Sequence, residues 1–439
     1  MTRFRWILAV ATVGCVLSAC TAAGGEEPTP VPEEATTISV WVSGDPEETQ
    51  AFLDVAEGFE ASQDAIDVDL VQIAERDDLI ARLSTAFAGG EPPDLFLMNF
   101  RYLGQFESKG ALEPLAPYLA ESDAFTQEDF YPEAMSAFQF GGEQVCMPQN
   151  VSSLVLYYNR DLFEQAGVPL PPAEGWSWND MVAAATELTQ DADGDGAVDV
   201  YGLGVDPEII RVAPFVWSNG GEVVDDPVSP TRSAIGSLRG IQAVQAFLDL
   251  RGVAGVTPTD EEAESQNFEE RFLDGTLAMM MESRKVVPSF RTITGFDWDV
   301  AQLPVHRRPA TILHSDAYCM TAASDRKDEA WTFLEFALGA DGQGIAAATG
   351  RTVPSLRSVA ESDAFLDPSA PPANSQVFLD NIPFIRAVPN VETWPEIEDV
   401  VNALLEEAYY ETGGRGEAGE LVVAILDQTA PLFERANVE

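Results

Sequence analysis

The sequence predicts an α/β protein with two domains, and three observations lead to that prediction. Strand-like and helix-like segments alternate in the order β-α-β-α-β between residues 38 and 98. A second stretch of the same kind begins after Pro148. About 400 residues follow position 37, which is enough chain for two domains of ordinary size. The alternating order predicts a parallel sheet with crossover helices.

The first half of the chain supplies the clearest elements. Residues 38–42, 66–73 and 94–98 predict three strands. Apolar residues at helical spacing predict helices over 52–59 and 79–87. In parallel sheets, ligands bind at the loops that leave the carboxyl ends of the strands. The loops after the first and third strands are therefore candidates for a binding site.

The second half continues the pattern with more helices. Residues 151–158 predict a strand and 160–166 a short helix. Ser177, three residues before Asp180, is typical of a capping box that opens the next helix. Further helices are predicted over 240–250, 267–273, 326–340, 341–348 and 396–410. Dimerisation heptads and internal repeats are not evident, and a monomer is expected.

The N-terminal residues predict export and anchoring. Arg3 and Arg5 precede an apolar run over 6–16, which is too short to span a bilayer. Leu17-Ser-Ala-Cys20 resembles the lipobox of bacterial lipoproteins, which implies a signal peptide at 1–19 and a lipid on the Cys20 thiol. The alternative is an ordinary secretory signal with an incidental cysteine. Residues 20–37, rich in Pro, Glu and Thr, predict a flexible tether.

The charge of the chain limits its partners. The net charge is −49, and it becomes −51 when the two arginines of the signal leave. A surface this acidic repels nucleic acid and anionic lipid, so neither is an expected partner. No later stretch reaches the roughly 18 to 20 apolar residues of a transmembrane helix. The expected location is extracytoplasmic, on a bacterial cell membrane, through the lipid anchor alone.

Seven segments, in order, carry a family resemblance. They are GEPPDLFLMN (90–99), the crossing at Met147-Pro148, LYYNRDLFEQAGV (156–168), SNGGEVV (218–224), FLDGTLAMM (272–280), DWDVAQLP (297–304) and TGRTVPSLRSVAES (349–362). Together they resemble the maltose-binding-protein-like, family-one extracellular solute-binding proteins of ABC importers. Each segment by itself is a weak match, and their order behind a lipobox makes the resemblance strong.

The resemblance implies a two-lobe, type II periplasmic-binding-protein-like fold whose discontinuous lobes are joined by hinge strands. The first lobe is expected to take 38–147 plus 317–362, and the second 148–316 plus 363–439. The implied function is capture of a small solute, with a carbohydrate expected, in a cleft between the lobes. Delivery to the permease subunits of an ABC importer would follow, and no cofactor is required.

A sugar needs aromatic faces for its C–H surfaces and planar polar groups for its hydroxyls. By the resemblance, the ligand-binding positions are Ser43, Asp45, Asn99, Phe100, Arg101, Asn150, Trp217, Arg284, Asp316, Arg351 and Trp394. Trp217 and Trp394 are the candidates for stacking on the ligand. Any of the polar residues could instead cap a helix or a turn.

Of the four cysteines, two are expected to be available for a disulfide. Cys15 leaves with the signal and Cys20 takes the lipid, so Cys146 and Cys319 remain in a compartment where disulfides persist. The resemblance places them on neighbouring hinge strands, which implies a disulfide between them. Two buried free cysteines are the alternative.

An acidic loop has the spacing of a calcium site. Asp191, Asp193, Asp195 and Asp199 match positions one, three, five and nine of an EF-hand loop, with Gly at position six. Position twelve, normally a bidentate Glu, is Gly202. A structural Ca²⁺ site and an acidic solvated turn both remain open.

Catalysis finds little support in the sequence. The two histidines, His306 and His314, lie beside no serine or cysteine motif, and no GxxxxGK[ST] loop exists. We therefore expect a binding protein and no enzyme. The alternatives are a membrane-anchored, polysaccharide-acting enzyme, whose carboxylate pairs are hard to exclude, and a ligand-binding subunit of a sensor system.

Overall fold

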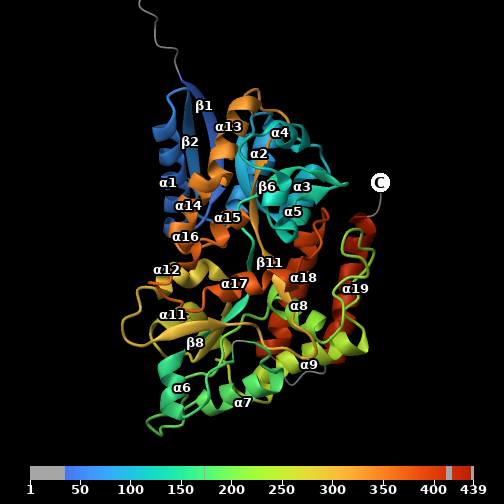
Figure 1. The fold of residues 1–439 in the computed structure, drawn as a ribbon. Coiled ribbons are helices and arrows are strands. Elements are labelled where there is room, and N and C mark those ends of the chain that lie inside the picture. The colour runs from blue at the N-terminus through green and yellow to red at the C-terminus, as the bar shows by residue number, and fades with distance from the viewer. Residues whose placement is uncertain (1–34, 173, 412–417, 437–439) are drawn as a thin grey trace, which may run out of the picture.

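The computed structural model describes residues 35–172, 174–411 and 418–436. Two lobes lie one above the other, each a sheet covered by helices, and the chain crosses between them more than once (Figure 1). Among the described residues, no helix has both the length and the apolar character needed to cross a bilayer. The signal peptide, Cys20 and residues 21–34 of the expected tether lie outside the described residues.

The upper lobe in Figure 1 is built on a five-stranded sheet in the order β2-β1-β3-β12-β6. Strand β1 pairs in parallel with β2 and β3, as the alternating order predicts, and β12 is antiparallel to β3 and β6. The strands are β1 (Thr36–Ser43), β2 (Ile66–Ile73), β3 (Leu95–Asn99), β6 (Cys146–Pro148) and β12 (Asp316–Met320).

Helices from two distant parts of the chain belong to this lobe. They are α1 (Pro46–Ser62), α2 (Arg76–Gly89), α3 (Leu103–Glu107), α4 (Ala116–Glu121), α5 (Pro132–Ala137), α13 (Lys327–Leu338), α14 (Ala340–Ala348), α15 (Arg357–Ala360) and α16 (Asp363–Leu366). Helix α1 begins where the Asp45 carboxylate accepts a hydrogen bond from the Glu48 amide at 2.8 Å. Its apolar face packs on α13, where the rings of Phe59 and Phe333 meet edge to face at 5.3 Å.

The lower lobe holds a three-stranded antiparallel sheet in the order β10-β8-β9, and a second small sheet, β13-β11-β7, lies near the junction. The strands are β7 (Ser152–Ser153), β8 (Val155–Asn159), β9 (Met279–Glu282), β10 (Trp298–Ala301), β11 (Thr311–His314) and β13 (Ile385–Arg386). The single strand predicted over 151–158 is thus two strands, β7 and β8, which join different sheets.

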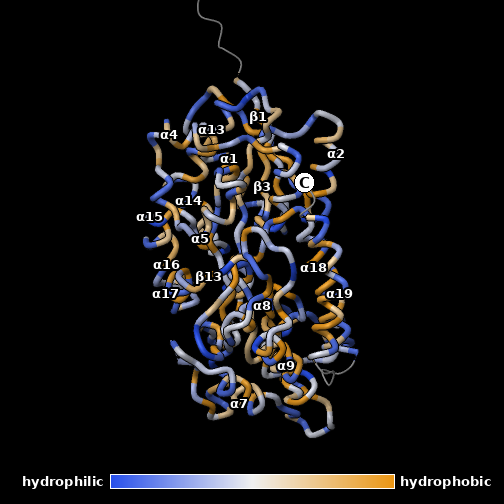
Figure 2. Tube along the Cα trace, turned by 90° about the vertical axis from the view of Figure 1, so that its right-hand side faces the viewer, coloured by the Kyte–Doolittle hydropathy of each residue, from blue (hydrophilic) through white to orange (hydrophobic). Residues whose placement is uncertain are grey.

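The lower lobe also contains the C-terminal helices. In Figure 2, hydrophobic residues (orange) recur along α8, α9 and α19. The helices of this lobe are α6 (Arg160–Ala166), α7 (Trp178–Leu188), α8 (Ile209–Ser218), α9 (Leu238–Gly252), α10 (Asp260–Ser265), α11 (Phe268–Leu273), α12 (Val287–Phe290), α17 (Gln376–Asp380), α18 (Trp394–Glu406) and α19 (Ala418–Ala436). A π-helical turn, Glu407–Glu411, follows α18.

One sequence expectation changes at the N-terminus, and another is confirmed at the hinge. Thr36 and Thr37, assigned to the tether, are part of β1 and pair with Ile66 and Asp67 of β2. At the junction of the lobes, β6 and β12 run side by side and Cys146 faces Cys319. The two sulfurs are bonded, so the predicted disulfide is confirmed.

Candidate functional site

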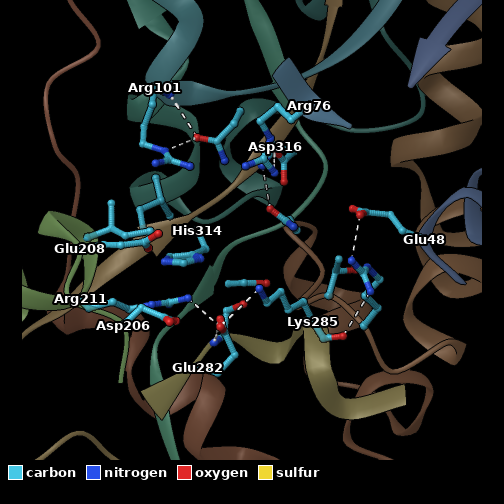
Figure 3. A pocket seen from close by; sticks show the side chains of 18 of the residues that line it. Glu48, Arg76, Arg101, Asp206, Glu208, Arg211, Glu282, Lys285, His314 and Asp316 are labelled. Carbon is cyan, nitrogen blue, oxygen red and sulfur yellow. Dashed lines mark hydrogen bonds and ion pairs between the residues drawn. The ribbon is translucent and has the colours of Figure 1, made fainter. Parts of the chain in front are cut away.

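A cavity of about 420 Å³ opens at the junction of the lobes, and we call it the central cleft (Figure 3). It lies at the carboxyl end of β3, where the α/β topology is expected to hold a ligand. Its walls are Glu48, Arg76, Asn99, Arg101, Asn150, Ser152, Asp206, Glu208, Ile210, Arg211, Glu282, Ser283, Lys285, Leu313, His314, Asp316, Arg351, Thr352 and Glu398.

Charged side chains dominate these walls. Six carry a carboxylate and five carry a guanidinium or ammonium group, while the apolar members are Ile210 and Leu313. The set contains no Trp, Tyr or Phe. The cleft therefore offers hydrogen-bond donors and acceptors in a small volume, and the imidazole of His314 is the one flat aromatic ring among the described residues of its lining.

The upper wall is organised by Asn99 at the end of β3. Its Nδ2 donates to the Ser315 carbonyl oxygen at 3.1 Å, and its Oδ1 accepts from Arg101 Nε at 3.0 Å. These bonds fix the guanidinium of Arg101, which forms an ion pair with Glu398 of α18. Burial raises the pKa of Glu398, and the positive charge of Arg101 opposes that rise.

The strands that cross between the lobes contribute Asn150 and Asp316. Asn150 Oδ1 accepts from the Asp316 amide at 3.0 Å, and the Ser315 hydroxyl donates to the Asn150 carbonyl oxygen at 2.5 Å. The Asp316 carboxylate lies 3.8 Å from Arg76 Nη2 at the start of α2. These hydrogen bonds hold two segments that cross between the lobes next to each other in the wall of the cleft.

The lower wall is centred on Glu282 at the end of β9. Its carboxylate lies 2.6 Å from Arg211 Nη2 of α8 and 3.4 Å from Lys285 Nζ. Burial by itself would raise the pKa of Glu282, but the charges of Arg211 and Lys285 outweigh it and lower the pKa to about 2. Burial, together with the nearby charge of Arg211, lowers the pKa of His314 well below its usual value. At neutral pH Glu282 is ionised and His314 is uncharged.

Arg351 connects the two walls. Its Nη2 lies 2.7 Å from an Asp45 oxygen and 2.9 Å from a Glu48 oxygen, and its Nη1 donates to the Lys285 carbonyl oxygen at 3.3 Å. One guanidinium thus joins the start of α1 in the upper lobe to the segment after β9 in the lower lobe. Burial raises the pKa of Glu48, and Arg351 opposes that rise.

Five of the residues expected from the sequence line the central cleft: Asn99, Arg101, Asn150, Asp316 and Arg351. Two more lie next to it. Asp45 contacts Arg351, and Ser43 lines a cavity of about 10 Å³ that shares Glu48, Arg76 and Asp316 with the cleft.

The two tryptophans expected to stack on the ligand are core residues. Trp217 is 2% exposed within α8, an entirely buried helix, and the Arg386 guanidinium covers its ring at 4.7 Å. Trp394 is 1% exposed and borders a small apolar cavity behind α18. Neither lines the central cleft, so the structure does not place an aromatic platform at these positions.

Phe100 and Arg284, also expected to bind the ligand, do not line the central cleft. Phe100 is 1% exposed and meets Phe138 edge to face. Arg284 is fully buried, with its guanidinium over the rings of Phe365 and Phe378 at 4.2 and 4.7 Å. Burial lowers the pKa of Arg284 to about 9. Its surroundings indicate a packing role, because aromatic faces attract a cation.

Sequence reasoning missed most of the charged walls. The missed residues are Glu48, Arg76, Asp206, Glu208, Arg211, Glu282, Lys285, His314 and Glu398. A signal exists for two of them: Arg211 is a single charge inside the apolar run 209–217, and Glu282 directly follows the apolar run 277–281. A charge buried with such a run needs a partner. The position of α8, which carries Arg211, was not predicted.

The acidic loop in the lower lobe is exposed. Oxygens of Asp191, Asp193 and Asp195 lie within 4.8 Å of one another. Asp199 accepts the Ala192 amide at 2.7 Å, so one of its oxygens is engaged by the loop backbone. Three of the four expected ligands converge, and the calcium site stays a prediction.

Two lobes joined by crossing strands, with a polar cleft at their junction, define the class of two-lobed solute-binding proteins. The chain belongs to the family described as "Bacterial extracellular solute-binding protein", whose model matches residues 54–373. The resemblance found in the sequence is thereby confirmed.

The chain is similar to several known proteins. It is 25% identical to a binding protein of Brucella abortus over 83% of this chain and 85% of the relative. It is also 25% identical to the mannitol-binding protein of Pseudomonas aeruginosa, over 83% and 86% of the two chains. A solved ABC substrate-binding protein of Listeria monocytogenes, in complex with cycloalternan, superposes with a TM-score of 0.81 at 24% identity, covering 92% of this chain and all of that one. These structural likenesses establish the two-lobe fold.

Proposed function

We propose that this protein captures a hydroxyl-rich solute, a carbohydrate or polyol, in the central cleft and delivers it to an ABC importer. The observation that supports the proposal is the composition of the cleft walls, where carboxylates alternate with guanidinium groups around about 420 Å³. A hydroxyl both donates and accepts, so it pairs well with such walls. The mannitol-binding relative and the cycloalternan complex agree with this class of ligand.

The same walls bear on ligand size. Long sugars are usually held by stacking on aromatic rings as well as by hydrogen bonds. Since no Trp, Tyr or Phe is among the described residues that line the central cleft, its binding energy has to come mainly from hydrogen bonds and charge. We therefore favour a polyol, a monosaccharide or a disaccharide over a longer chain.

The lobe boundaries are part of the proposal. The sheet of the upper lobe contains β1 from Thr36, β6 up to Pro148 and β12 from Asp316, so we move the expected boundaries to 36–148 and 149–315, with the first return at 316. Helix α16 contacts α14 and α15 of the upper lobe, which favours ending the return segment at Leu366 instead of 362. The remaining C-terminal residues, including α18 and α19, go with the lower lobe because they contact α8 and α9.

Ligand binding is tested by thermal unfolding of the purified full-length protein against mannitol, glucose, cellobiose and maltotriose. A ligand at about 100 times its Kd should stabilise the fold by roughly 2.7 kcal/mol. Asp316→Asn, in the cleft, should reduce the stabilisation, while Asp328→Asn, on the exposed face of α13, should not. Recovery of the unchanged sugar by chromatography would support capture without turnover. If no sugar or polyol raises the melting temperature, the proposal is wrong.

Anchoring by Cys20 completes the proposed function. The family is extracellular, and a lipid on this residue would hold the protein at the membrane that contains the importer. Cys20→Ala should abolish labelling by a radioactive fatty acid and release or mis-process the protein. Unchanged membrane association of that variant would contradict the anchor.

A further inference from the structure

In the central cleft every basic side chain has an acidic partner, but two of the acidic side chains have no basic partner. Each of its five basic side chains has a carboxylate within 4 Å: Arg76 with Asp316, Arg101 with Glu398, Arg211 and Lys285 with Glu282, and Arg351 with Glu48. Two carboxylates differ. Within the described part of the chain, those of Asp206 and Glu208 have no basic group within 4.0 Å and accept no hydrogen bond.

Asp206 and Glu208 occupy the segment that leads into α8, and both line the cleft. Figure 3 places them on the same side of the cavity, with His314 and Arg211 nearby. His314 is uncharged at neutral pH and cannot neutralise them. Arg211 is 4% exposed and bonded to Glu282 through Nη2. One wall of the cleft thus keeps two acceptor groups that the protein itself leaves without a partner.

We propose that the ligand is an aminated carbohydrate, such as an amino sugar or aminocyclitol, and that Asp206 and Glu208 bind its ammonium group. This inference rests on the proposed function and narrows it. Removing carboxylates from water costs free energy unless they are paired, and an ammonium group supplies both charge and donors. An anionic ligand is disfavoured, because every cation of the cleft already has a carboxylate partner.

Two further observations agree with a cationic ligand. Burial raises the pKa of Asp206 to about 6; Arg211 opposes that rise and the negative charge of Glu208 adds to it. The ionised Asp206 carboxylate is therefore held at a cost in free energy that a bound cation would relieve. In addition, Nε and Nη1 of Arg211 have no hydrogen-bond partner among the described residues. A hydroxyl next to the amine would offer them an acceptor.

Matched pairs of sugars test the inference. Glucosamine differs from glucose, and chitobiose from cellobiose, by replacement of a hydroxyl with an amine at one position of each ring. Titration calorimetry at pH 7 should show the aminated member of at least one pair binding about tenfold tighter or better, with a preference that shrinks as salt is added. Asp206→Asn and Glu208→Gln should each weaken binding of that aminated sugar by about tenfold.

The controls separate the possible outcomes. Glu187→Gln, an exposed change on α7, should alter no affinity. Asp206→Asn should melt no lower than the wild type at pH 7, because burial and the charge of Glu208 together outweigh the attraction of Arg211 for the Asp206 carboxylate. Replacing a residue whose role is purely structural would lower the melting temperature. If Asp206→Asn does not fold, Glu208→Gln carries the test. Equal or tighter binding of the neutral sugars overturns the inference and leaves the proposed function standing. Binding of neither kind overturns both.

Discussion

Arg101 and Glu398 form an ion pair that joins the loop after β3 to helix α18, although 297 positions separate them in the chain. Both side chains are largely buried, at 15% and 10% exposure. The pair also borders the central cleft, so it links the contact between the two lobes to the ligand site.

The first prediction concerns this pair. Arg101→Met should lower the free energy of unfolding by about 2 to 4 kcal/mol, because it leaves the Glu398 carboxylate buried without its counter-charge. Lys109→Met, which breaks the exposed Lys109–Glu392 pair, should cost less than about 1 kcal/mol. Urea denaturation of both variants measures the difference, and losses of equal size would contradict the prediction.

The second prediction concerns Trp217. Because its ring lies in the core of the lower lobe, Trp217→Phe should lower stability by about 1 to 3 kcal/mol and leave the Kd of the identified ligand within about twofold. Trp331→Phe, in the core of the upper lobe, is the control: it shows how much stability is lost when a core tryptophan away from the cleft is replaced. Calorimetry that finds a tenfold weaker Kd for the first variant alone would restore a stacking role.

The third prediction is a pH dependence of stability set by Asp206. Its folded pKa of about 6 exceeds its ordinary value of 3.8, so the folded state binds more protons than the unfolded state between these values. Stability should therefore fall as pH rises through this window, by about 1 to 3 kcal/mol. Asp206→Asn should remove that part of the pH dependence in urea titrations at pH 4 and pH 7. A wild type and a variant with parallel pH profiles would be inconsistent with the raised pKa.

The fourth prediction concerns the disulfide. Cys146 and Cys319 are 173 positions apart, and closing a loop of that length restricts the unfolded chain. Replacing both with Ala should lower the free energy of unfolding by up to about 5 kcal/mol. Wild-type protein in reductant should approach the stability of the variant. Mass spectrometry of the non-reduced protein checks the bond itself, and two free thiols would rule it out.

The fifth prediction concerns the acidic loop. Ca²⁺ bound by Asp191, Asp193 and Asp195 should raise the melting temperature, and a chelator should reverse the rise. Asp193→Asn should abolish the effect, whereas Asp226→Asn, in another exposed acidic turn, should not. An unchanged melting temperature in millimolar Ca²⁺ would identify the loop as a solvated turn.

Two elements were predicted to the residue, while others, such as α1 and α2, extend beyond the expected bounds. Strand β2 and helix α6 have the bounds expected from the sequence, at 66–73 and 160–166. Helix α8 was not predicted. All ten of its residues are buried, and Pro214, a residue type that usually breaks helices, lies inside it. Because α8 was not predicted, Arg211 and the part of the cleft wall next to it were not predicted either.

The sequence alone determined the class of fold, the strand-end loops that hold Asn99 and Arg101, and the family. These depend on local periodicity and on motifs that are contiguous in the chain. Only the tertiary structure decided which charges meet in the cleft, and that Trp217 and Trp394 lie in the core instead. Arg351 and Glu48, 303 positions apart, are hydrogen-bonded because the return segment passes the start of α1. Pairing of this kind depends on how distant segments pack, since an ion pair acts over a few ångströms whatever the distance along the chain.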